Sequence, residues 1–114
     1  MADDSGQVRR MLGQLLAALP QFNVVGEAKD GLQALKAVSE LRPDILILDI
    51  RMPKFTGLEV LTALQEQGST CKVLVFSQLG EKPYREKCFE LGAQGFFEKV
   101  SGFDQFHRTL KKMR

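Results

Sequence analysis

The sequence predicts an α/β fold in which helices cover both faces of a doubly wound parallel sheet. The apolar period switches repeatedly between a spacing of three or four, typical of helices, and short continuous runs, typical of strands. One such run, ILIL at residues 45–48, is apolar at four consecutive positions, as in a strand buried on both faces. Predicted strands and helices alternate strictly, and this order indicates crossover connections between parallel strands.

The first half of the chain predicts two helices and two strands. The first helix has an apolar stripe from Val8 to Leu19 and ends near Pro20. The β-branched run NVVGE at residues 23–27 predicts a strand. A second helix begins at Asp30, has leucine and valine spaced by three, and stops before Pro43. The run DILILD at residues 44–49 then predicts the strand buried on both faces.

The second half continues the alternation. We expect helices over residues 56–67, 82–91 and 103–113, and strands over residues 72–77 and 95–98. The total is five helices but only four strands. A doubly wound sheet normally begins with a strand, so the first, central strand is predicted to be missing.

The missing strand has a structural consequence. Its absence leaves the backbone of its two neighbours unpaired beneath helices, at a cost of about 1 to 3 kcal/mol for each lost hydrogen bond. Three outcomes are open: the remaining four strands close up, another chain covers the exposed edges in a dimer or a swapped arrangement, or the natural protein begins upstream of Met1. We expect a rearranged or oligomeric fold.

Composition restricts the class of protein. A chain of 114 residues with 44% hydrophobic and 26% charged residues predicts one N-terminally truncated globular domain over residues 1–114. We expect a cytoplasmic protein with no membrane contact, because there is no long apolar run or secretory signal. Cys71 and Cys88 are expected to be reduced, structural thiols. The net charge of +2 comes from scattered residues, so we expect no direct binding to nucleic acid.

Polar residues follow the predicted strands where the carboxyl ends meet at one edge of the sheet. These residues are Asp3, Asp4, Asp49, Ser77 and Lys99. Three close carboxylates repel one another, so they either raise their pKa values or hold a cation. An oxygen cluster with few protein ligands suits Mg²⁺, which shares its coordination shell with phosphate oxygens. The lysine and the serine can neutralise and hydrogen-bond those oxygens.

Together these motifs resemble a receiver domain of a two-component response regulator, similar to the stand-alone chemotaxis type. The resemblance rests on DD before the first helix, DIRMP with Gly57 further on, FS, and EK after GFF, and it covers essentially the whole chain. It implies a flavodoxin-like fold and a cytoplasmic phosphoprotein that is not an enzyme toward other substrates. Such a domain catalyses only its own phosphorylation and dephosphorylation, and its partner is a sensor histidine kinase or a phosphotransfer protein.

The resemblance also implies roles for single residues. Asp49 is the phosphoacceptor, and Ser77 and Lys99 contact the phosphoryl group. The expected ligands of Mg²⁺, or of Mn²⁺, are Asp4 directly, Asp3 through water, Asp49, and the backbone carbonyl of Arg51. Phe96 is the expected switch residue, which swings inward as Ser77 moves.

Three departures or variable positions affect regulation. Val100 stands where the family usually has proline after the lysine, so a cis proline bond cannot set the angle of Lys99. Arg51 and Leu79 occupy the positions that tune dephosphorylation; neither orients water, and this predicts slow self-dephosphorylation. The expected output or dimer face is formed by residues 82–91, 95–98 and 103–113. It carries Tyr84, Arg85, Phe103 and Phe106.

Other classes fit less well. A metal-dependent phosphohydrolase needs a second acid at the position of Arg51, and a flavin carrier needs a glycine- and hydroxyl-rich loop that DDSGQ does not supply. The remaining alternative is a receiver-derived interaction or dimerisation module that is not phosphorylated because its first strand is absent. His107 lies on the last predicted helix, away from the carboxylates, and is interpreted as a surface residue.

Overall fold

The computed structural model describes residues 1–3, 5–19, 21–50, 56–77, 84–98 and 103–112. Its sheet has three parallel strands in the order β1 (Ile45–Asp49), β2 (Lys72–Ser77) and β3 (Gly95–Glu98). Asp49 lies opposite Phe76, and Ser77 lies opposite Glu98. The carboxyl ends of all three strands therefore meet at one edge, as the alternation of the sequence predicts.

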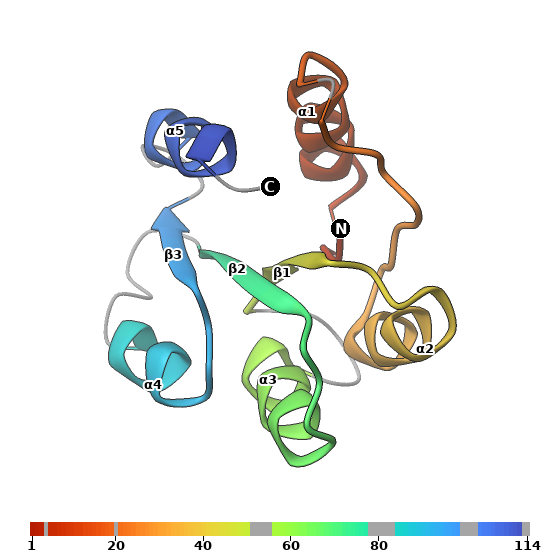
Figure 1. The fold of residues 1–114 in the computed structure, drawn as a ribbon, viewed down its shortest axis with the longest axis vertical. Helices are drawn as coiled ribbons and strands as arrows, with labels where there is room; N and C mark the ends of the chain where they lie inside the picture. Colours follow the sequence, from red (N-terminus) through yellow and green to blue (C-terminus); the bar gives the residue numbers. More distant parts are fainter. Residues whose placement is uncertain (4, 20, 51–55, 78–83, 99–102, 113–114) are drawn as a thin grey trace.

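Helices cover both faces of this sheet, which confirms the predicted α/β class (Figure 1). The five helices are α1 (Gly6–Ala17), α2 (Gly31–Leu41), α3 (Gly57–Glu66), α4 (Arg85–Glu90) and α5 (Phe103–Lys112). Figure 1 shows α1 and α5 on one face, and α2, α3 and α4 on the other. Side chains cap the N-terminal ends of three helices: Ser5, Asp30 and Thr56 each accept a hydrogen bond from a backbone N–H in the first turn.

Each face has its own hydrophobic core. On the α1 and α5 face, the rings of Phe76, Phe97 and Phe106 pack together, with centroids 4.6 to 5.8 Å apart. Phe106 is fully buried in this cluster. Its assignment to an exposed output face was therefore wrong, because α5 turns this ring toward the sheet. Tyr84 and Arg85, assigned to the same face, are exposed; the side chain of Phe103 lies outside the described part.

The N-terminal residues lie where the missing strand would run. Ala2 bridges both Ala28 on one side and Leu48 of β1 on the other. Its N–H donates to the Ile47 carbonyl (2.7 Å), and its carbonyl accepts from the Asp49 N–H (2.8 Å). Ala2 and Asp3 are each only 2% exposed. The end of the central strand is thus present as a stub, which we define as residues Met1–Asp3.

One expectation about this region was wrong, and one of the three open outcomes is not found. Residues 23–27 form no strand, although an isolated bridge follows at Ala28. The physical reason is that a strand needs a paired neighbour: within the described residues no strand lies beside Val24 and Val25, which are 41% and 52% exposed. The sheet also does not close into four adjacent strands, because the stub holds Ala28 and Leu48 apart.

No helix in the described part of the chain is both long and apolar enough to cross a membrane.

Candidate functional site

Asp49 ends β1 and is 2% exposed. Its N–H is held by the stub through the Ala2 carbonyl. Behind it, the first residue of α3 comes so close that a Cβ on Gly57 would collide with the Asp49 carbonyl oxygen and lie 2.7 Å from the Ile50 Cα. The Gly57 N–H donates to the Ile50 carbonyl at 2.7 Å. Glycine at this position therefore lets the helix begin directly against the backbone of the aspartate, which accounts for one part of the sequence motif.

Ser77 ends the neighbouring strand, one position beyond the residue paired with Asp49. Its side chain is fully buried, and its Oγ has no hydrogen-bond partner within the described residues. An unsatisfied buried hydroxyl costs about 1 to 3 kcal/mol. Such a group is an unusual feature of a core and indicates a place where a ligand oxygen can bind.

Asp3 is brought to the same edge by the stub. Its N–H pairs with the Ala28 carbonyl at 3.0 Å, and its Oδ1 accepts from the Ser5 N–H at 2.9 Å. Because Ala2 pairs with Asp49 and the next residue is Asp3, two buried carboxylates belong to adjacent strand ends. The structure places the backbones of Asp3, Asp49 and Ser77 at one edge of the sheet, and their roles stay predictions.

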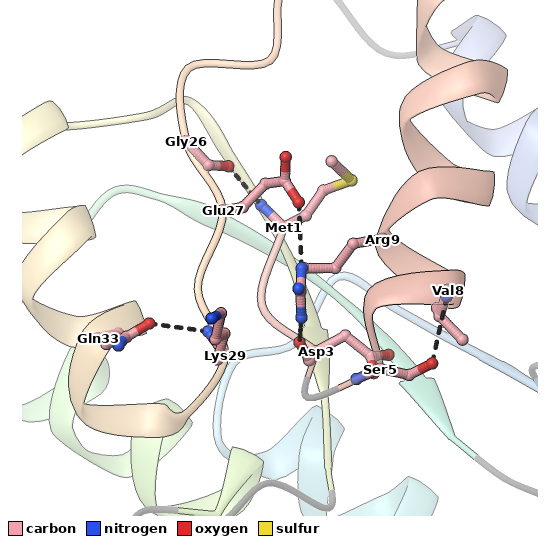
Figure 2. A network of polar contacts seen from close by, with 9 residues as sticks. All are labelled: Met1, Asp3, Ser5, Val8, Arg9, Gly26, Glu27, Lys29 and Gln33. Carbon is pink, nitrogen blue, oxygen red and sulfur yellow. Dashed lines mark hydrogen bonds and ion pairs between the residues drawn. The ribbon is translucent and has the colours of Figure 1, made fainter.

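Arg9 is a residue of this site that sequence reasoning missed. Figure 2 shows its guanidinium reaching from α1 across the stub: Nη1 donates to the Asp3 carbonyl (2.6 Å), and Nε pairs with Glu27 Oε1 (3.1 Å). The arginine therefore links α1, the stub and the segment before α2. The one sequence signal was an arginine in the first turn of a helix that directly follows the aspartates.

Several predicted site residues lie outside the described part of the chain. They are Asp4, Arg51, Leu79, Lys99 and Val100. Within the described part, no group of three or more His, Cys, Asp or Glu side chains is close enough to hold a metal ion. Asp4 lies outside the described part, so the three-carboxylate site stays a prediction.

The remaining candidates lie on β3, α4 and α5 and just before β2. Phe96 is half-buried and packs against the core on the α2, α3 and α4 face, and its switch role stays a prediction. His107 is a partly exposed residue of α5. Cys88 is buried in the core, and the half-buried Cys71 has a pKa raised by burial and by the nearby Asp44 carboxylate.

Comparisons with known proteins place this arrangement in a family. The profile of the response regulator receiver domain matches residues 1–111. A protein-glutamate methylesterase/protein-glutamine glutaminase of Syntrophomonas wolfei is 36% identical over 90% of this chain and 29% of its own length. The response regulator GacA of Pseudomonas aeruginosa is 30% identical over 99% of this chain and 53% of its own length. The chain thus spans only about a quarter to a half of these relatives.

Solved structures give the same result. The receiver domain of the response regulator NarL from Mycobacterium tuberculosis superposes with a TM-score of 0.87 at 31% identity, over 96% of this chain and 89% of that one. The response regulator domain of CheB from Thermotoga maritima gives a TM-score of 0.85 at 32% identity, over 96% and 87%. With the strand ends and their buried polar residues as described, the chain belongs to the response regulator receiver domain family of two-component signalling proteins.

Proposed function

We propose that the chain accepts a phosphoryl group on Asp49 from a phosphohistidine of a sensor histidine kinase or phosphotransfer protein. The observation that carries this proposal is a buried carboxylate at the end of β1 beside a fully buried hydroxyl at the end of β2 that has no hydrogen-bond partner among the described residues. A phosphoryl group on Asp49 would supply acceptor oxygens for the Ser77 hydroxyl.

The step balances as a simple displacement. An Asp49 carboxylate oxygen forms a bond to phosphorus while the phosphorus–nitrogen bond of the donor histidine breaks, and the bonding electron pair returns to the imidazole nitrogen. Phosphoryl transfer needs positioning and charge neutralisation more than covalent chemistry from the protein. The stub and the close start of α3 hold the Asp49 backbone, and the Ser77 hydroxyl donates to a phosphoryl oxygen in the product.

The donor set fits a divalent cation. Asp3 and Asp49 are buried carboxylates at adjacent strand ends, where oxygen ligands of Mg²⁺ are expected. Asp3, Asp4, Asp49 and the Arg51 carbonyl would hold Mg²⁺ or Mn²⁺. When bound, the ion supplies neutralisation of charge on the carboxylates and on the phosphoryl oxygens. Lys99 is proposed to contribute a further positive charge.

The proposed unit is one domain over residues 1–114 that signals by a change of conformation and has no activity toward other substrates. Phe96 and Ser77 are its proposed switch, and slow self-dephosphorylation is proposed from Arg51 and Leu79. A cytoplasmic location, a homodimer through the sheet edge or the α4, β3 and α5 face, and the absence of nucleic-acid binding also belong to this proposal. The activities of the longer relatives are not assigned to the chain.

The test is phosphorylation by a small donor. The chain is incubated with acetyl phosphate and Mg²⁺, and intact mass is measured for the wild type, Asp49→Asn and Ser77→Ala. We expect a gain of one phosphoryl group in the wild type, no gain in Asp49→Asn, and slower gain in Ser77→Ala. Absence of any gain in wild type at about 10 mM Mg²⁺, with no binding of beryllofluoride, would contradict the proposal and favour the unphosphorylated interaction module.

A further inference from the structure

Three other residues hold Asp3 in place at the edge of the sheet. Its N–H donates to the Ala28 carbonyl at 3.0 Å, its Oδ1 accepts from the Ser5 N–H at 2.9 Å, and its carbonyl accepts from Arg9 Nη1 at 2.6 Å. In the first two contacts the partner is a main-chain group, whereas in the third it is a charged side chain. The third contact is therefore the one that a substitution can remove.

The position of Arg9 is unfavourable for a cation as far as α1 itself is concerned. The N–H groups at the start of a helix carry partial positive charge, which stabilises nearby anions and disfavours nearby cations. The first turn of α1 contains no acidic residue. The opposite charge comes instead from a separate segment, because Glu27 Oε1 lies 3.1 Å from Arg9 Nε. The stability of α1 does not account for an arginine at this position, whereas the contact with the Asp3 carbonyl does.

The guanidinium of Arg9 lies between its two acceptors, as Figure 2 shows. The Arg9 side chain is only 14% exposed, although that of Glu27 is 54% exposed. A planar guanidinium presents its donors in fixed directions and can bind both acceptors at once, which distinguishes it from the ammonium of a lysine. Glu27 thus orients Arg9, and Arg9 fixes the carbonyl of Asp3. Because a peptide unit is planar, this contact also fixes the direction in which the chain leaves Asp3.

The charge of Glu27 has a second consequence. A lone guanidinium beside a cation site would repel the ion. Arg9 and Glu27 form an ion pair and together add no net charge. The pair can therefore hold Asp3 without opposing a divalent cation.

We propose that Arg9 is a positioning residue of the proposed cation site, and that the Arg9–Glu27 pair holds Asp3 in the geometry that favours Mg²⁺ over a larger ion such as Ca²⁺. Mg²⁺ requires near-ideal octahedral geometry with ligands at about 2.0 to 2.1 Å, whereas Ca²⁺ accepts irregular geometry at about 2.3 to 2.6 Å. A displaced Asp3 therefore weakens Mg²⁺ binding more than Ca²⁺ binding. This inference rests on the proposed function and deepens it, since it assigns the residues that set the metal selectivity.

The test compares the affinities of the chain and its variants for Mg²⁺ and Ca²⁺. Each ion is titrated into the isotope-labelled chain, amide chemical shifts give the Kd, and circular dichroism confirms that each variant is folded. We expect Arg9→Ala to raise the Kd for Mg²⁺ about tenfold, as is typical when a residue that orients a metal ligand is removed. The Kd for Ca²⁺ should rise less than about threefold. Arg10→Ala, at the exposed neighbour, should leave both values within about twofold.

Glu27→Gln separates the effect of charge from that of position. This variant keeps the bond from Arg9 to Asp3 but leaves the guanidinium charge unbalanced. Both ions should then bind about twofold more weakly, and this difference should disappear in about 1 M salt. The double variant Arg9→Ala/Glu27→Gln keeps the net charge of the wild type and should show the same loss of selectivity as Arg9→Ala.

A separate variant distinguishes failure of the proposed function from failure of this inference. Absence of Mg²⁺ binding by the wild type up to about 10 mM, or unchanged binding by Asp49→Asn, would overturn both. If Asp49→Asn loses Mg²⁺ while Arg9→Ala keeps the wild-type ratio of the two Kd values, the inference alone is overturned, because a purely structural role leaves this ratio unchanged. If Arg9→Ala does not fold, Arg9→Lys decides in its place: we expect a Kd for Mg²⁺ raised about threefold, and a wild-type ratio would overturn the inference.

Discussion

The two contacts of Arg9 allow a direct test of whether α1 stabilises the position of the stub. Arg9→Ala removes a 2.6 Å hydrogen bond from a cation to the Asp3 carbonyl and a 3.1 Å ion pair with Glu27. A hydrogen bond that involves a charged group contributes about 1.5 to 3 kcal/mol. The ion pair adds about 0.2 to 1 kcal/mol, because the Glu27 side chain is 54% exposed and water screens it.

We therefore expect Arg9→Ala to lower the free energy of unfolding by about 2 kcal/mol, the low end of the sum, because water can partly replace the guanidinium. Urea titration followed by circular dichroism measures this difference. For a chain of 114 residues, the corresponding fall in Tm is roughly 8 °C. Arg10→Ala is the matched control, since Arg10 is the exposed neighbour on the same helix.

A second variant separates the two contacts. Glu27→Gln removes the ion pair and leaves the bond to the Asp3 carbonyl, so its cost should stay below about 1 kcal/mol. If Arg9→Ala costs no more than Glu27→Gln or Arg10→Ala, the bond to the carbonyl contributes nothing and the reasoning is refuted. If Arg9→Ala weakens Mg²⁺ binding while Arg10→Ala does not, the Arg9 contact also helps to hold Asp3 in its proposed position as a metal ligand.

Three further predictions concern other parts of the fold. Gly57→Ala should lower the free energy of unfolding, measured by urea titration, by about 1 to 3 kcal/mol, because the new Cβ meets the Asp49 backbone. Gly6→Ala, at the first residue of α1, should be tolerated, because its Cβ meets only arginine side-chain ends at 3.5 Å. Phe106→Ala should cost about 3 to 5 kcal/mol in the same assay, and Phe89→Ala, at a 38% exposed ring, should cost less than about 1 kcal/mol. Burial lowers the pKa of the Met1 ammonium below 8.0, so the folded chain loses this proton at a lower pH than the unfolded chain does. Stability should therefore rise as the pH increases toward 8, and a chain acetylated at Met1 should lack this rise; a pH-independent difference between the two chains would contradict it.

The elements that could be predicted from sequence are those whose signal is local. The apolar run of β1 predicted a strand that is buried on both faces. In the structure, four of the five residues of β1 are buried. The start of α2 followed from Asp30, whose Oδ1 accepts from the Gln33 N–H at 2.8 Å. Because consecutive strands were connected by helices, the meeting of Asp49 and Ser77 at one edge was also predictable.

The features that could not be predicted depend on partners distant in sequence. The run at residues 23–27 has β-branched residues, but strand formation requires a paired neighbour, and no strand within the described residues pairs with this run. The sequence did not show that the stub lies between β1 and the segment at residues 26–28. This position depends on five backbone hydrogen bonds from the stub to those two segments. The Arg9 contact was also not predictable, because its acceptor is a main-chain carbonyl, which every residue has.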